Sequence, residues 1–478
     1  MSLLKRISIR YMPFADAASD DFPLSQLLRL SLFQVSVGMA AVLLLGTLNR
    51  VMIVELQVPA FLVASMVALP VLIAPFRALL GFKSDTYKSA IGWKRIPYLW
   101  FGTLWQFGGL AIMPAALLVL GGDVTQVRYD IPFAGEALAG IAFLMTGLGM
   151  HMTQTAGLAL AADRATDETR PRVVALLYVM LLIGMAVSSI VIGWFLREFT
   201  PIELIQVVQA TAVVTIVLNV IALWKQERVQ PMTRAQREAA EDDPSFADAW
   251  ADYAAGGTAG RLLAVVFLGT IAFNMQDVLL EPYGGEILGL SVSATTMLTA
   301  TWATGALVGF ALAAKWLSGG INPYRMGARG ILAGLVAFSA VIFANPWGSA
   351  PLFFAGAALI GFGGGLFSVA TLTAAMTMPA GKAGRGLALG AWGAAQATAA
   401  GLSTAIGGGI RDLVNSAATQ GHLGAALDNP ATGYSVVYHI EILFLFITLV
   451  ALGPLVRTAT TDMREGGAGK IGLADLPT

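Results

Sequence analysis

A few ionisable and amide side chains interrupt the long apolar stretches of this chain. His151 lies three residues before Gln154 in one stretch, and Asp277 lies three residues after Asn274 in another. A neutral imidazole can bond a hydroxyl or ligate a metal centre, and a carboxylate in an apolar environment is costly unless it serves a purpose. The residues predicted on this basis to bind a cargo or a bound cofactor are His151, Gln154, Asn274, Gln276, Asp277, Glu281, His439 and Glu441.

The competing interpretation is that these groups pair across helix interfaces and only fix the packing. It is favoured for charged residues near the ends of their apolar stretches, namely Arg50, Glu55, Glu281 and Glu286. For His151, which lies near the middle of its stretch, a binding role is favoured.

The elements that carry these residues are predicted from composition and hydropathy. The chain has 478 residues, of which 56% are hydrophobic and 12% are charged, about half the charge of a soluble domain. A helix needs roughly 20 apolar residues to cross a bilayer. Twelve such helices are predicted at 28–49, 59–80, 97–120, 134–162, 173–196, 203–224, 261–281, 293–317, 327–345, 350–377, 387–410 and 433–456.

The distribution of basic residues predicts the orientation of these helices. With both termini in the cytoplasm, the opposite side holds only Arg50, Arg128, Arg197 and Arg411 of the 29 basic residues. Such a bias follows the positive-inside rule and favours the twelve-helix count, because a lost helix would mix the charges.

The predicted organisation has five parts. They are a cytoplasmic segment 1–27, a six-helix bundle 28–224, a cytoplasmic linker 225–260, a second six-helix bundle 261–456 and a cytoplasmic tail 457–478. The first segment shows no signal-peptide pattern, and a short interfacial helix or a basic tail are equally compatible with it.

Several classes of function are excluded or disfavoured by composition. The chain has no cysteine and three histidines, so disulfides are excluded and most zinc chemistry is disfavoured. The net charge is zero, which offers no field for nucleic acid. The glycine run 361–365 lies inside an apolar stretch with no preceding strand, so helix packing is favoured there over a ligand surface.

Short polar motifs mark the loops and suggest a repeat. Arg95-Ile-Pro97-Tyr98 precedes the third helix, and Ile321-Asn-Pro323-Tyr324 precedes the ninth. The loop after the second helix resembles the major-facilitator loop signature of glycine, aspartate and basic residues. It predicts a cytoplasmic charge latch made of Gly81, Asp85, Lys94 and Arg95, with a solvated loop as the alternative.

Several sequence blocks resemble the PucC/LhaA family of photosynthetic purple bacteria, a branch of the major facilitator superfamily. The most specific is Gln276-Asp277-Val-Leu-Leu-Glu281-Pro-Tyr283-Gly-Gly285-Glu286. The others are Leu32-Phe-Gln34-Val-Ser-Val-Gly38-Met, Gly46-Thr-Leu-Asn49-Arg50-Val-Met-Ile-Val-Glu55, Trp93-Lys-Arg-Ile-Pro97-Tyr98, Gly149-Met-His151-Met-Thr-Gln154-Thr-Ala-Gly157-Leu-Ala-Leu-Ala-Ala-Asp163, Gly363-Gly-Gly-Leu-Phe367 and Gly390-Ala-Trp392-Gly393.

The resemblance implies an all-helical membrane protein of two six-helix repeats that assembles a light-harvesting antenna, with complex I favoured over complex II. It implies bacteriochlorophyll or a precursor as bound pigment or cargo. Independently of the resemblance, His151 and His439 are the imidazoles available within helices to ligate the magnesium of such a pigment. The resemblance also implies a location in the photosynthetic inner membrane. The implied partners are the antenna polypeptides, the reaction centre and the machinery that makes or inserts pigment. It implies no catalytic activity.

Two other functions compete with this interpretation. A secondary transporter of a small metabolite, drug or ion shares the fold, and fold does not determine function. It is disfavoured because the first six helices place their acids mostly at helix ends. A membrane enzyme of pigment synthesis is the least favoured, because no acidic cluster for diphosphate-bound magnesium is present in the sequence.

Overall fold

The computed structural model describes residues 17–19, 22–72, 93, 95–121, 133–166, 169–226, 257–318, 320–377 and 384–465, and the regular elements among them are helices, with no strand. Each predicted helix has a counterpart, the second only in its first half. The helices are α2 Leu24–Leu30, α3 Leu32–Ala41, η2 Val42–Leu48, η3 Val51–Glu55, α4 Ala60–Leu72, α6 Ile96–Leu120, α7 Ala134–Arg164, α8 Arg170–Phe195, α9 Pro201–Leu223, α12 Gly257–Asn274, η6 Met275–Val278, α13 Leu280–Glu286, α14 Val292–Ser318, α15 Pro323–Ala344, α16 Ala350–Thr377, α17 Gly384–Thr419 and α18 Ala431–Glu465.

Within the described ranges, nine helical spans are long and apolar enough to cross a membrane. Local signals set where several helices begin. Pro97 and Pro323 lie in the first turns of α6 and α15, where a missing backbone N–H costs nothing, so both motifs chosen from the sequence do start helices. Thr200 caps α9, and its hydroxyl accepts a hydrogen bond from the Glu203 amide at 3.1 Å.

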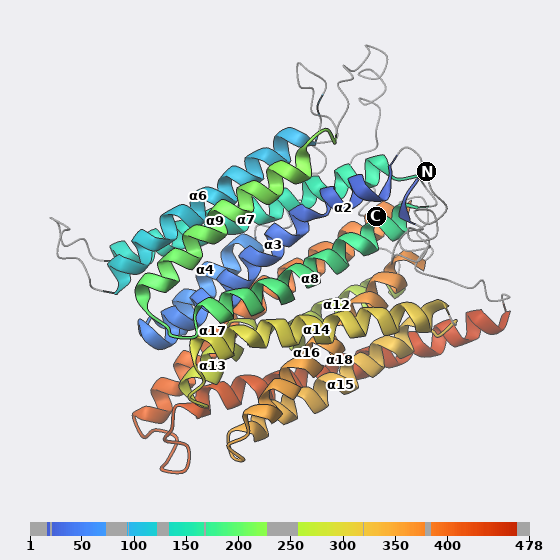
Figure 1. Ribbon diagram of the computed structural model, residues 1–478. Coiled ribbons are helices and arrows are strands. Elements are labelled where there is room, and N and C mark those ends of the chain that lie inside the picture. Colours follow the sequence, from blue (N-terminus) through green and yellow to red (C-terminus); the bar gives the residue numbers. More distant parts are fainter. Residues whose placement is uncertain are drawn as a thin grey trace.

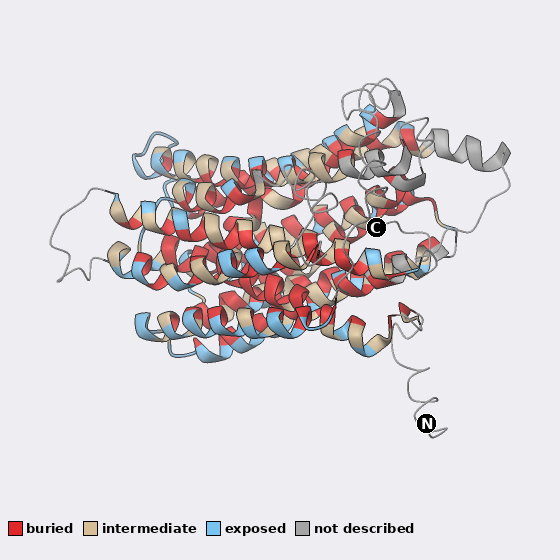
Figure 2. Ribbon diagram, turned by 90° about the horizontal axis from the view of Figure 1, so that it is seen from above, coloured by how far each residue is buried: buried red, intermediate tan, exposed pale blue. Residues whose placement is uncertain are grey.

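The helices run side by side in two groups that follow the order of the chain (Figure 1). Helices α2 to α9 form one group, and α12 to α18 form the other. The groups meet where α4 packs on α17 and α8 packs on α14. Buried residues concentrate where helices face one another, and exposed residues lie on the outer faces (Figure 2). Exposed apolar side chains on these outer faces are what a lipid environment requires.

The seventh membrane pass differs from its prediction. Glu281 was expected to end the helix before Pro282, with a loop over 282–292. That expectation is wrong, because the chain makes a 3-10 turn, η6, and then continues as α13 through Glu286. Pro282 lies in the first turn of α13, where proline is tolerated, so the loop is only 287–291.

The first pass also continues beyond its predicted end at residue 49. The π-helical stretches η2 and η3 carry it to Glu55. Such widened turns shift the side chains that follow them, and they are frequent at functional sites. Here they lie beside the second group of helices, with Gly46 directly against the Glu281 carboxylate.

Reporter fusions test the orientation, which remains a prediction. Fusions within 121–133 and 287–291 should report the periplasm, and fusions within 81–95 and 225–260 should report the cytoplasm, because of the bias in basic residues. A cytoplasmic signal from 287–291 would contradict the predicted orientation.

Candidate functional site

The two groups of helices are joined by hydrogen bonds at the end of the bundle that contains α13. The Thr47 and Thr296 hydroxyls lie 3.0 Å apart, and the Asn49 amide donates to the Val278 carbonyl at 2.9 Å. The Phe61 backbone amide donates to the Asp412 carboxylate at 2.7 Å. The hydrogen bonds between described residues of the two groups lie at this end, which is called the joined end below.

Arg50 contributes further contacts at the joined end. Its guanidinium forms an ion pair with Glu55 and donates to the Leu290 carbonyl at 3.3 Å. Glu281 lies nearby and accepts a hydrogen bond from the Thr299 hydroxyl at 2.5 Å. Arg50 and Glu55 pair within the first pass, whereas the predicted pairing was across helix interfaces.

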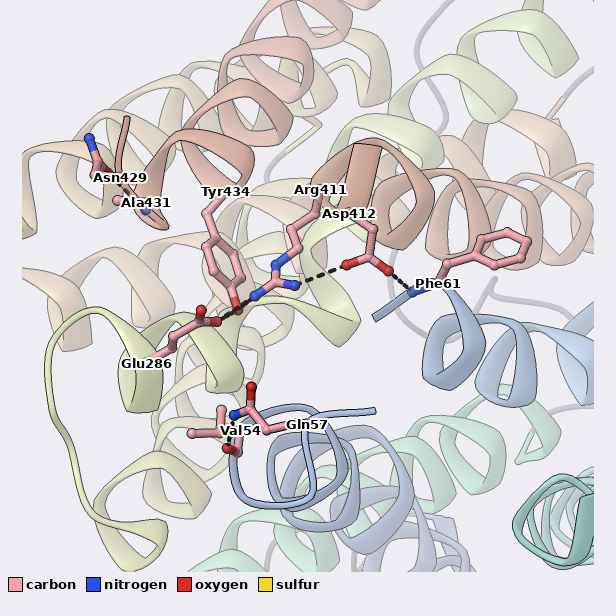
Figure 3. Close-up of polar contacts among 9 residues, drawn as sticks. All are labelled: Val54, Gln57, Phe61, Glu286, Arg411, Asp412, Asn429, Ala431 and Tyr434. Carbon is pink, nitrogen blue, oxygen red and sulfur yellow. Dashed lines mark hydrogen bonds and ion pairs between the residues drawn. The ribbon is translucent and has the colours of Figure 1, made fainter. Parts of the chain in front are cut away.

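Arg411 organises a second network at the same end (Figure 3). Its guanidinium contacts Glu286 at 2.5 Å, Asp412 at 2.9 Å and the Tyr434 hydroxyl at 3.1 Å. The Tyr434 hydroxyl in turn donates to Glu286 at 2.7 Å. Because Asp412 also accepts from Phe61, the network links α13, α17 and α18 to the start of α4.

A cavity of about 220 Å³ lies in the second group of helices and touches the first group at Leu182. Aromatic rings and small residues form most of its wall. Gly364 and Gly365 line it, whereas Gly361 and Gly363 pack against backbone of α14 and α15, so the glycine run serves helix packing and also opens the cavity. The lining residues are Leu182, Gly269, Thr270, Phe273, Asn274, Asp277, Trp302, Ala306, Phe310, Ile360, Gly364, Gly365, Phe367, Ser368 and Gln396.

Asp277 is the acidic residue of this wall. One of its oxygens accepts from the Asn274 side-chain amide at 2.8 Å, and the other accepts from the Gln276 side-chain amide at 2.7 Å. The backbone N–H of Gln276 donates to the buried Glu441 carboxylate at 2.7 Å. Four of the predicted residues thus form one connected cluster, and Asn274 and Asp277 face the cavity.

The remaining predicted residues lie elsewhere. His151 is half-buried on α7, and its Nδ1 has no hydrogen-bond partner among the described residues. Neither His151 nor Gln154 lines the cavity. His439 is exposed on α18, where its Nδ1 lies 2.6 Å from the Ser435 carbonyl of its own helix. The eight residues therefore do not form a single site.

The predicted cytoplasmic latch is described only at Arg95. Its Nε donates to Asp163 at 2.9 Å, which ties the start of α6 to the end of α7. Gly81, Asp85 and Lys94 lie outside the described residues, so the latch stays a prediction.

Comparison with known proteins places this architecture in a family. A family model described as PUCC protein matches residues 47–460. The chain belongs to the PUCC family. This PUCC-family chain is 62% identical over 478 residues to an uncharacterized protein in the puhA-bchM intergenic region of Rhodobacter capsulatus, covering 100% of this chain and 99% of that one.

Two further relatives carry names that bear on function. Protein PucC of Cereibacter sphaeroides is 51% identical, with 96% of this chain and 98% of that protein covered. The bacteriochlorophyll synthase 44.5 kDa chain of Rhodobacter capsulatus is 28% identical, with 90% and 95% covered.

The solved structures confirm the major-facilitator fold of this PUCC-family chain. A bacterial homologue of the human lysosomal transporter Spinster superposes with a TM-score of 0.66 at 13% identity, covering 92% of this chain and 98% of that one. Identity this low supports the fold and nothing finer.

Sequence analysis missed the importance of three residues in this PUCC-family chain. Arg411 was counted only as a basic residue on the less basic side, although a buried arginine demands partners. Gln396 and Trp302 line the cavity, and neither was singled out. The sequence does mark Gln396, because it is an isolated amide in the alanine-rich stretch Gly393-Ala-Ala-Gln396-Ala-Thr-Ala-Ala.

Proposed function

We propose that this chain is an assembly factor for a photosynthetic light-harvesting antenna, with complex I favoured over complex II. The family match over residues 47–460 carries this proposal, and the similarity to proteins named PucC supports it. The preference for complex I rests on the length and overall sequence pattern of the chain. The proposal places it in the photosynthetic inner membrane with both termini cytoplasmic.

The partners that we propose follow from this role. They are the antenna polypeptides, the reaction centre and the machinery that makes or inserts pigment. The lipid-facing apolar surface of α6, α8 and α9 supports contact with other membrane helices as well as with lipid. We propose no catalytic step for the chain.

Bacteriochlorophyll or a precursor is the proposed cargo. The distant relative named as a bacteriochlorophyll synthase chain supports a connection to this pigment. The cavity does not fit the macrocycle, because its volume of about 220 Å³ is below the roughly 300–1,000 Å³ of sites that enclose drug-sized ligands. A pigment is therefore proposed to bind outside this cavity.

His151 is the residue that would hold the magnesium of the pigment. Its Nδ1 lacks a partner among the described residues, and imidazole nitrogen is a metal ligand. When bound, the pigment would be the cargo, and its only chemistry there would be the absorption of light. The chain would supply the imidazole and exclude water from it.

Absorption spectroscopy tests the pigment proposal. The protein purified in detergent from photosynthetic cells should carry bacteriochlorophyll absorbance, and His151→Leu should lower the pigment per protein at least fivefold. His422→Leu, which makes the same change in an exposed loop, should leave pigment unchanged.

Two outcomes would contradict this assignment. Full pigment in a well-folded His151→Leu variant would make His151 a packing residue. A wild-type protein without pigment would remove the cargo proposal. If the wild-type protein carries no pigment, loss of the antenna complex in cells that lack this chain would nevertheless support its role in antenna assembly.

A secondary transporter is the second candidate, and one observation favours it. The acidic residues of the first six helices lie mostly at helix ends, which disfavours a transporter. Asp277 of the seventh pass nevertheless lines the cavity, which is where a transporter needs an ionisable group.

A further inference from the structure

The lining of the cavity in the second group of helices contains a single carboxylate, that of Asp277. Asp277 and Asn274 reach the cavity from the seventh pass, and Gln396 reaches it from α17. Thr270 and Ser368 add hydroxyl groups to the same wall. Polar groups from three helices therefore converge on a space that the function proposed above leaves unused.

The carboxylate of Asp277 has no charged partner among the residues that the structure describes. Both of its hydrogen-bond donors, on Asn274 and Gln276, are neutral amides. Among the described residues, no Lys, Arg or His nitrogen is within ion-pair distance of it. A carboxylate has about four acceptor positions, so each oxygen can accept one more hydrogen bond.

Glu441 contacts the residue next to Asp277 on the side away from the cavity lining. It is fully buried and accepts the Gln276 backbone N–H at 2.7 Å, which holds the backbone next to Asp277 in place. Its second oxygen has no partner within the part of the chain that the structure describes. Glu441 is therefore a positioning residue for the carboxylate in the cavity.

Aromatic rings form the rest of the wall. Trp302, Phe310, Phe273 and Phe367 all line the cavity, and the last two rings lie 5.9 Å apart, tilted by 36°. The faces of aromatic rings attract cations, most strongly where water is excluded. A wall that combines a carboxylate with aromatic rings favours positive charge with an apolar periphery.

We propose that this cavity binds a small organic cation, with its ammonium group at Asp277 and its carbon atoms against Trp302 and the phenylalanines. The volume of about 220 Å³ limits the ligand to a small molecule. An anion would meet the Asp277 carboxylate, and a neutral molecule would gain neither the ion pair nor the cation–π attraction. This site does not depend on the pigment proposal, because the two use different residues.

Fluorescence titration of the purified full-length protein in detergent tests the site. The probe is tetramethylammonium chloride, compared with sodium chloride at equal ionic strength and with tert-butanol as a neutral molecule of similar size. Tetramethylammonium should change tryptophan emission saturably, and Trp302→Phe should remove that change although other tryptophans remain. tert-Butanol should bind at least tenfold more weakly.

A matched pair of variants isolates the charge. Asp277→Asn keeps the size of the side chain and should weaken tetramethylammonium at least tenfold. Asp428→Asn makes the same change in an exposed loop and should leave the affinity unchanged. Equal affinity in wild type and Asp277→Asn, equal binding of tert-butanol, or no saturable response in the wild type would each overturn the proposal. These outcomes say nothing about pigment content or antenna assembly. The cation-site proposal and the proposed function can therefore each fail without the other.

Discussion

Replacing Arg411 with leucine should lower the free energy of unfolding by about 3 kcal/mol. The substitution removes the cation that Glu286, Asp412 and Tyr434 share (Figure 3). Removing one partner of a buried ion pair leaves uncompensated charge, which typically costs about 3–5 kcal/mol. The lower value is expected here because 29% of the Glu286 side chain is exposed, so water can partly solvate it.

Reversible unfolding in mixed micelles measures this loss, with Arg197→Leu as the matched control. Arg197 is exposed near the end of α8, and its replacement should change stability by less than about 0.5 kcal/mol. The double variant Arg411→Leu with Glu286→Gln should recover part of the loss, because one stranded charge is removed. Equal stability of Arg411→Leu and wild type would show that the network contributes nothing.

Gly361→Ala should destabilise the protein by about 1–3 kcal/mol, the usual cost of overpacking. A Cβ atom at Gly361 would collide with the Trp302 backbone carbonyl and lie 3.2 Å from the Ala306 backbone nitrogen. Backbone cannot move aside as a flexible side chain can, so α14 and α16 would have to separate. The same unfolding measurement reports the change.

Gly393→Ala is the control for this prediction. It makes the same substitution in α17, where an added Cβ meets no heavy atom within 4 Å. Alanine is the better helix former by about 1 kcal/mol, so Gly393→Ala should be neutral or stabilising. If both variants lose the same stability, close packing at Gly361 is not the cause.

Local patterns in the sequence predict the helices well, because a membrane helix must satisfy its backbone internally and present apolar side chains over about 20 residues. Prolines at Pro97 and Pro323 add reliable starts. Pro282 differs from the prediction, because it lies in the first turn of α13 and does not end a helix. Whether a proline ends a helix or lies in its first turn depends on the 3-10 turn η6 before it, and packing around Gln276 sets that turn.

The polar residues of the candidate site were predictable one at a time but not as a group. An ionisable residue within an apolar stretch is conspicuous in sequence, so His151, Asp277 and Glu441 were all found. Their separation in space was not predictable. Asp277 and Glu441 belong to one cluster, whereas His151 lies on a different helix away from the cavity.

The sequence by itself determined the twelve apolar helices, the family and which side chains are costly in a membrane. These follow from composition and local spacing, which the chain carries whatever its tertiary structure. Only the tertiary structure decided that Gln276 meets Glu441 across 165 residues and that Arg411 meets Glu286 across 125. Helical periodicity states which face of a helix is polar, but the partner of that face depends on how all the helices pack, which no local pattern records.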